Sequence, residues 1–169
     1  MSISDQGSLT GRYTLVPRSL IFLTQANQVL LIKGAPEKKL WAGLYNGLGG
    51  HIERGEDVIS SARRELREEA GIETASLWLC GVITIDTGQA SGIAIFVLRG
   101  ESASEALRAS AEGDLEWVAM DQIERLPVVE DLPVLLKRAL AIQPGNPPFS
   151  AHYQARPGEA LRIRFSDEG

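Results

Sequence analysis

Three glutamates crowd onto one side of a short predicted helix that lies between glycines. A helical pattern covers residues 56–70 and stops at Gly71, a residue typical of helix C-termini. At about 100° per residue, Glu65, Glu68 and Glu69 fall within one arc of roughly 100°. The apolar stripe of the same helix lies next to this arc. We therefore expect Glu65 and Glu69 at the rim of the buried face.

This clustering of charge has two explanations. The helix could carry a solvated acidic face, in which Arg64 pairs with Glu68 at i, i+4. Like charges at that spacing destabilise a helix by about a few tenths of a kcal/mol, and screening is weaker beside a core. A hard divalent cation removes the conflict, because Mg²⁺ and Mn²⁺ favour oxygen ligands and bridge carboxylates to substrate phosphates. We interpret the three glutamates as a metal platform.

The segment before the helix is rich in glycine. Gly49 and Gly50 would let the backbone approach a ligand closely, and Gly55 permits a turn into the helix. The pattern is that of a strand, a loop and an acidic helix. Neither GxxxxGK[ST] nor GxGxxG occurs, so the sequence has no Walker loop and no dinucleotide fingerprint.

The remaining elements alternate between strands and helices. Strands are predicted at 13–23, 28–34, 76–86, 91–100 and 114–120, a helical turn at 120–126, a second helix at 129–143, and a hairpin at 152–165. This order indicates an α+β fold or a mixed-sheet α/β sandwich. We expect a loose leader at 1–11, one domain at 12–142, and a tail at 143–169 that packs on the same domain.

Length and charge restrict the class of protein. A chain of 169 residues suits one domain, and a net charge of -5 argues against a general nucleic-acid binder but not against a phosphate substrate. Cys80 is the only cysteine, which excludes an intrachain disulfide and favours a reducing compartment. No signal peptide or membrane span is evident. We expect a cytoplasmic protein without a membrane partner, and leave open whether it forms a homodimer.

One motif in the sequence is highly specific. Its fixed positions are Gly50, Glu56, Arg64-Glu65-Leu66, Glu68-Glu69 and Gly71-Ile72. They match GX5EX7REUXEEXGU, the Nudix box, at every specified position, where U is a bulky aliphatic residue. The segments KG…LYNGLGGHIERGE and EGDLEWV and the order of strands also resemble MutT-type Nudix hydrolases. The resemblance extends over most of residues 12–142.

This resemblance implies an α/β/α sandwich around a mixed sheet and hydrolysis of a nucleoside diphosphate linked to another group, X. Water would attack phosphorus with the help of Mg²⁺ or Mn²⁺. By the resemblance Glu65, Glu68 and Glu69 are metal ligands, and one of the last two deprotonates the water. Glu56 and Arg64 would form a structural salt bridge.

Two further contacts to the metal are implied by the same resemblance. The carbonyl of Gly49 or Gly50 would complete the metal shell. Glu112 resembles a downstream glutamate that reaches the metal in some MutT-type enzymes, although a plain loop glutamate is the alternative.

Residues around the box suggest how a nucleotide is held. LYNGLGG resembles the WNGxGG of members that clear oxidised purine nucleoside triphosphates, with Tyr45 in place of tryptophan. Asn46 could pair with a purine edge and Trp41 or Tyr45 could stack on a base, or the two rings could be packing anchors. The list of expected substrate contacts is Trp41, Tyr45, Asn46, Gly50, Lys33, Arg18 and Glu130. Lys33 and Arg18 could equally be surface charges.

The resemblance leaves several activities open. The first hypothesis is a pyrophosphohydrolase of nucleoside triphosphates, oxidised purines included, and the second is a hydrolase of ADP-ribose, a dinucleoside polyphosphate or another NDP-X. A third is a nucleotide-sensing module without turnover. An isopentenyl diphosphate isomerase would need an active-site cysteine, and Cys80 lies in an apolar run that predicts a core strand. The expected partner is a small nucleotide and not a nucleic-acid polymer.

Overall fold

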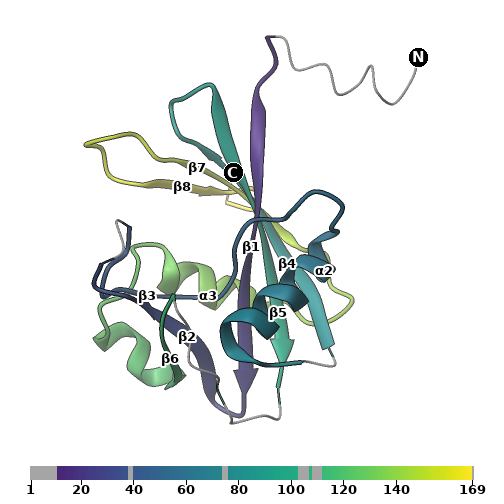
Figure 1. Cartoon of the computed structure of the whole chain (residues 1–169). Coiled ribbons are helices and arrows are strands. Elements are labelled where there is room, and N and C mark those ends of the chain that lie inside the picture. The colour runs from purple at the N-terminus through teal and green to yellow at the C-terminus, as the bar shows by residue number, and fades with distance from the viewer. Residues whose placement is uncertain (1–10, 38–39, 74–75, 103–106, 108–111, 169) are drawn as a thin grey trace.

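The computed structural model describes residues 11–37, 40–73, 76–102, 107 and 112–168 (Figure 1). The strands are β1 (Thr14–Gln25), β2 (Gln28–Gly34), β3 (Tyr45–Asn46), β4 (Ser76–Asp86), β5 (Ser91–Glu101), β6 (Gly113–Ala119), β7 (Phe149–Gln154) and β8 (Arg162–Phe165). The helices are α2 (Val58–Glu65), a π-helical turn η1 (Leu66–Ala70), a 3₁₀ helix η2 (Met120–Arg125) and α3 (Leu132–Ala141). None of the helices in the described part has the length and apolar character needed to cross a membrane.

The strands form one mixed sheet in the order β3-β2-β1-β5-β4-β7-β8, with β6 paired to β2. β1 is parallel to β5 and β4 is parallel to β7, whereas the other pairs of strands are antiparallel. β1 and β2 pair only at Thr24–Val29 and Gln25–Gln28. Beyond that point Leu48 and His51 bridge to β1 instead. The sheet therefore opens between β1 and β2, and the glycine-rich segment occupies the opening.

Each face of the sheet is covered by one helix, because side chains alternate along a strand. Ile21 of β1 belongs to the same core cluster as Leu66, on the motif helix. Its neighbour Phe22 belongs to a second cluster that contains Leu135 and Leu136 of α3. The two layers of helix confirm the predicted α/β/α arrangement around a mixed sheet.

The boundaries of the motif helix differ slightly from the prediction. The helix begins at Val58, two residues later than expected, because Asp57 caps it: Oδ1 accepts hydrogen bonds from the Ile59 and Ser60 amides at 2.8 and 2.9 Å. The last turn is a π-helix, a variant that is frequent at functional sites. Gly71 ends the helix in the left-handed conformation, at φ 68°, as the sequence predicts.

Most other predicted elements are present. The hairpin of β1 and β2, the pair β4 and β5, the strand β6 and the helices η2 and α3 lie where the sequence places them. The C-terminal hairpin is also present, but β7 begins at Phe149, three residues before the predicted start. Most of the connection 101–113 and of the leader 1–11 lies outside the described residues. The domain boundaries stay a prediction.

Leu135→Ala tests the core between α3 and the sheet. Leu135 is 1% exposed and Val134 on the same helix is 39% exposed. We expect Leu135→Ala to lower the free energy of unfolding by about 3 kcal/mol, since it removes buried methyl groups and leaves a cavity. Val134→Ala is the control and should cost about 0.5 kcal/mol. Urea unfolding measures both, and equal losses would show that this core has been assigned wrongly.

Candidate active site

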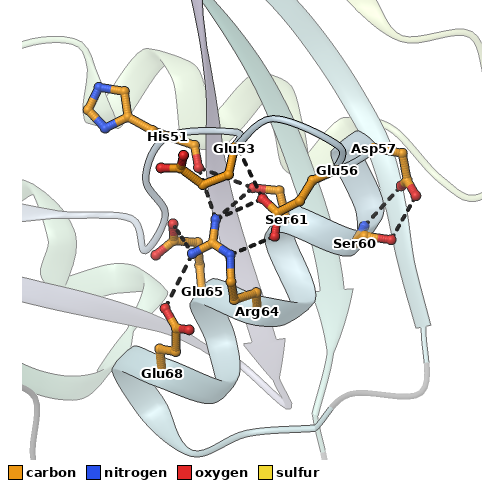
Figure 2. A network of polar contacts seen from close by, with 9 residues as sticks. All are labelled: His51, Glu53, Glu56, Asp57, Ser60, Ser61, Arg64, Glu65 and Glu68. Atoms are coloured by element: carbon orange, nitrogen blue, oxygen red, sulfur yellow. Dashed lines mark hydrogen bonds and ion pairs between the residues drawn. The ribbon is translucent and has the colours of Figure 1, made fainter.

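Arg64 is the centre of the polar network around the motif helix (Figure 2). Its Nε donates to Glu56 Oε1 at 2.7 Å and its Nη2 donates to Glu56 Oε2 at 3.0 Å. Nη2 also donates to the His51 carbonyl at 3.0 Å. The two-pronged contact fits the planar fork of a guanidinium. It fastens the helix to the loop that precedes it, in the arrangement the sequence predicts for Glu56 and Arg64.

The same guanidinium also contacts two glutamates of the motif helix. Arg64 Nη1 donates to Glu65 Oε1 at 2.8 Å and to Glu68 Oε2 at 3.3 Å. The hydrogen bonds that Arg64 donates to Glu56, Glu65 and Glu68 raise the pKa of Arg64. In return, the hydrogen bond from Arg64 lowers the pKa of Glu56 to about 2. One cation thus offsets the repulsion among three carboxylates.

Glu69 takes a different position, against the glycine pair. It is only 7% exposed, and its Oε2 accepts a hydrogen bond from the Gly49 amide at 3.1 Å. A Cβ at position 50 would lie 2.4 Å from Glu65 Oε1, so the absence of a side chain at Gly50 lets the Glu65 carboxylate lie against the backbone. The carboxylates of Glu65 and Glu69 therefore lie at the rim of the buried face, as predicted.

The ligand atoms that the motif helix offers are of the type that a hard divalent cation prefers. Glu65, Glu68 and Glu69 offer oxygen atoms only, next to the backbone of Gly49, which suits Mg²⁺ or Mn²⁺. Among the described residues, however, no group of three or more His, Cys, Asp and Glu side chains is placed to hold a metal ion. Glu65 and Glu68 instead contact Arg64, so these side chains would have to reorient to enclose a cation.

A cavity of about 920 Å³ lies on the α3 face of the sheet, and among the described residues of the motif helix only Glu69 reaches its wall. Its floor is largely apolar and includes Leu20, Ile85, Ile93, Ile95 and Tyr153. The predicted site residues that line it are Arg18, Trp41, Asn46, Gly49, Glu69, Glu112 and Glu130. Glu69 therefore belongs both to the motif helix and to the cavity wall, whereas Glu65, Glu68 and Gly50 do not line the cavity.

Two predicted substrate contacts, Tyr45 and Lys33, do not line the cavity. Tyr45 is 7% exposed, and its hydroxyl donates to Glu116 Oε2 at 2.7 Å, which raises the pKa of Tyr45 to about 12. Lys33 Nζ lies 5.6 Å from the centre of the Tyr45 ring. The Tyr45 ring cannot stack on a base in this position. It is a packing anchor, the alternative that the sequence left open, and the expected contact is corrected accordingly.

The loop before the box supplies more accessible groups. Trp41 is 48% exposed and lines the cavity together with Leu40. Asn46 Oδ1 accepts a hydrogen bond from the Gly47 amide at 2.8 Å, which orients the side-chain amide. Trp41 therefore has the exposure that stacking on a base requires, and Asn46 has a fixed orientation beside it.

Sequence reasoning missed many of the cavity residues, among them the titratable Asp131, Tyr153, Arg156 and Glu159. Burial raises the pKa of Asp131. Tyr153 is 1% exposed, and burial and the neighbouring Asp131 raise its pKa as well. The acids at 130–131 were visible in the sequence, but only Glu130 was expected to contact substrate. Nothing in the pattern of the predicted hairpin indicated that its residues face a cavity.

The titratable side chains of His51 and Cys80 are not among the candidate metal or substrate contacts. The His51 side chain is exposed and its ring points away from Arg64 in Figure 2, which agrees with a solvent-facing histidine. Cys80 is fully buried in β4, and burial raises the pKa of its thiol to about 11. A buried neutral thiol does not fit the catalytic cysteine that an isomerase would need.

Known proteins resemble this chain over most of its length. The family model described as the NUDIX domain matches residues 14–139. An oxidized purine nucleoside triphosphate hydrolase of Danio rerio is 30% identical over 106 residues, which cover 62% of this chain and 67% of that protein. A MutT protein from Bacillus halodurans matches with TM-score 0.76 and 24% identity, over 92% of this chain and 100% of that chain.

A further solved structure is the NUDIX domain of NrtR from Shewanella oneidensis, in complex with ADP ribose. It matches with TM-score 0.66 and 15% identity, over 83% of this chain and 98% of that chain. At these identities the two solved structures support the fold alone. The architecture expected from the motif is confirmed.

Acid titration tests the pairing of Glu56 with Arg64. The pKa of Glu56 is depressed, so its contribution to stability is present above the ordinary value of 4.5 and is lost as the pH falls through about 2. We expect Glu56→Gln to remove part of the loss of stability between about pH 4.5 and pH 2. Urea unfolding across this range is the measurement. Identical pH slopes for both proteins would contradict the pairing.

Proposed function

Because this chain belongs to the Nudix family, as a MutT-type hydrolase that acts on phosphoric anhydride bonds, we propose that it is a Mg²⁺- or Mn²⁺-dependent pyrophosphohydrolase of nucleoside triphosphates or related nucleotides. The observation that carries the proposal is the position of Glu69. This carboxylate belongs to the acidic motif helix, contacts the glycine pair, and lines a cavity with an apolar floor. A cavity of this kind suits a small ligand whose reactive end meets a few polar groups.

The proposed reaction is a balanced hydrolysis. The oxygen of water attacks phosphorus, the P–O bond of the anhydride breaks, and the leaving phosphate keeps the bonding electrons, so that a nucleoside triphosphate and water give a nucleoside monophosphate, pyrophosphate and a proton. A bound Mg²⁺ or Mn²⁺ would supply positive charge to the phosphoryl oxygens and lower the pKa of water. Glu65, Glu68 and Glu69 would hold the cation, with Glu112 as a further oxygen donor.

Among these glutamates, Glu69 is the best candidate for the general base. It lines the cavity, whereas the Glu68 side chain is 57% exposed and contacts Arg64. A base must lie within reach of the proton that it accepts, and the cavity is where the nucleotide would bind. Arg64 and Glu56 would keep the helix in position without touching substrate.

The nucleoside would lie between the apolar floor and the loop that carries Trp41. Base stacking on an exposed aromatic ring is worth about 1–3 kcal/mol. Asn46, Glu130 and Asp131 would then be hydrogen-bonding groups for the edge of the base, and Arg18 a phosphate contact. The likeness to an oxidized purine nucleoside triphosphate hydrolase supports a purine triphosphate as the first substrate to test. The second candidate is ADP-ribose or another NDP-X, supported by the likeness to a domain that binds ADP ribose.

Products distinguish these substrates. Incubation of the protein and Mg²⁺ with dGTP, 8-oxo-dGTP, 2-hydroxy-dATP, ADP-ribose and a dinucleoside polyphosphate should release pyrophosphate from at least one triphosphate. Phosphate-product analysis by ion-exchange chromatography is the measurement. AMP and ribose phosphate from ADP-ribose alone would favour the second candidate. Binding of nucleotide with no product from any compound would favour the sensing module instead.

Removal of a motif carboxylate tests the metal platform. Glu69→Gln should lower turnover by about 10²–10⁴-fold, since it removes a base or a metal ligand while it keeps the shape of the side chain. Glu68→Gln should weaken Mn²⁺ binding, measured by calorimetry, and turnover with it. Glu73→Gln, an exposed acid after the helix, is the control and should behave as wild type. If both motif variants are folded and turn over substrate at a near-normal rate, Glu68 and Glu69 are not the metal ligands or the general base.

A further inference from the structure

One wall of the cavity comes from a part of the chain that follows the family match. The match ends at residue 139. The cavity is also lined by six residues of the C-terminal hairpin and its loop, namely Tyr153, Ala155, Arg156, Pro157, Glu159 and Leu161. The hairpin is therefore part of the binding cavity and not only a cover for the edge of the sheet.

The backbone of this wall is fixed to the sheet. β7 pairs in parallel with β4 from Gly81–Phe149 to Asp86–Gln154, and the Ala155 amide then donates to the Asp86 carbonyl at 2.9 Å. The turn between β4 and β5 lies beside the hairpin loop, since a Cβ on Gly88 would meet Arg156 Cγ at 3.8 Å. Figure 1 shows the two loops extending together from the same end of the sheet. The backbone next to Arg156 is therefore held in place by the sheet.

The guanidinium of Arg156 is available to a ligand. Arg156 is exposed, lines the cavity, and makes no hydrogen bond or ion pair from its side chain to another described residue. The charged residues of the cavity lining are Glu69, Glu112, Glu130, Asp131 and Glu159 against Arg18 and Arg156. A polyanionic nucleotide entering this acidic cavity needs compensating charge, and Arg156 supplies it on the hairpin wall.

The position of Arg156 separates it from the motif helix. Gly49 and Arg18 lie at β1, whereas Arg156 follows β7, and the sheet order β1-β5-β4-β7 places three strand spacings between them. At about 4.8 Å each, the separation of the backbones is roughly 14 Å. Trp41 and Glu130 line the same cavity. The motif end of the cavity and its hairpin wall are therefore two different places.

We propose that Arg156 is a specificity-determining residue that binds the anionic part of the substrate beyond the scissile anhydride, the group X of NDP-X. This inference rests on the proposed function. A guanidinium presents its donors in a planar fork that matches phosphate oxygens. In a nucleoside triphosphate X is the terminal phosphate, whereas in ADP-ribose it is a neutral ribose, so Arg156 would favour the triphosphate. Thr87 and Gln89 of the adjoining turn line the cavity next to it and offer further hydrogen bonds.

Equilibrium binding to Arg156→Ala tests the proposal. Dissociation constants for a nucleoside triphosphate and the matching diphosphate are measured by calorimetry in EDTA, with wild type, Arg156→Ala, Arg156→Lys and Arg164→Ala. The diphosphate differs from the triphosphate only in the absence of X. We expect Arg156→Ala to weaken binding of the triphosphate about tenfold and binding of the diphosphate less than about twofold. The affinity of Arg156→Lys for the triphosphate should lie between those of wild type and Arg156→Ala, because lysine keeps the charge but lacks the planar fork of donors.

Arg164→Ala is the matched control, since Arg164 is an exposed arginine on β8 of the same hairpin that does not line the cavity. It should bind both nucleotides as wild type does. Equal losses for the two nucleotides in Arg156→Ala would place the Arg156 contact on the nucleoside diphosphate that both share and overturn the proposal. So would wild-type protein that binds the triphosphate no more tightly than the diphosphate. Binding is measured without metal, so a negative result in this test counts against the role of Arg156 alone. Failure to release pyrophosphate in the presence of Mg²⁺ would instead count against the proposed function.

Discussion

The Arg64 guanidinium holds the groups on which the whole site depends. It binds both oxygens of Glu56, the carboxylates of Glu65 and Glu68, and the carbonyl of His51, so one cation joins the loop and the helix. Without it the helix would carry a cluster of like charges with weak screening. A divalent cation would therefore meet carboxylates that are already ordered by Arg64, and would compete with it for two of them.

The second constraint is the opening of the sheet between β1 and β2. The motif helix packs on one face and the cavity lies on the other, so a continuous sheet would separate the acidic helix from the cavity. Because β1 leaves β2 after two pairs of residues, the glycine segment fits alongside β1. The Gly49 amide then meets Glu69, and this carboxylate reaches the cavity wall. Because glycine has no side chain, the backbone of this segment can lie close against β1.

The sequence was informative where local chemistry decides the structure. Runs of β-branched and large apolar residues between turns, the stop at Gly71 and the carboxylates next to an apolar stripe follow from residue order alone. They predicted the strands, the motif helix and the position of Glu69 at the rim of its buried face. It was uninformative where packing of distant segments decides. Tyr45 resembles a stacking residue, but Glu116 on β6, another strand that pairs with β2, binds its hydroxyl and the core surrounds its ring. Tyr153 and Arg156 reach the cavity only because β7 pairs with β4, a pairing that no local pattern specifies.

The parallel pairing of β4 with β7 also affects when the cavity can form. A parallel pair needs a long crossover, and here η2 and α3 lie between the two strands in the chain. Contacts between residues far apart in sequence carry a large loop-closure cost and form slowly. The contacts of Arg64 all lie within residues 51–68 and are therefore local in sequence. The hairpin wall depends on the pairing of residues 149–154 with β4, so the complete cavity can form only after β7 and β8 have been synthesised.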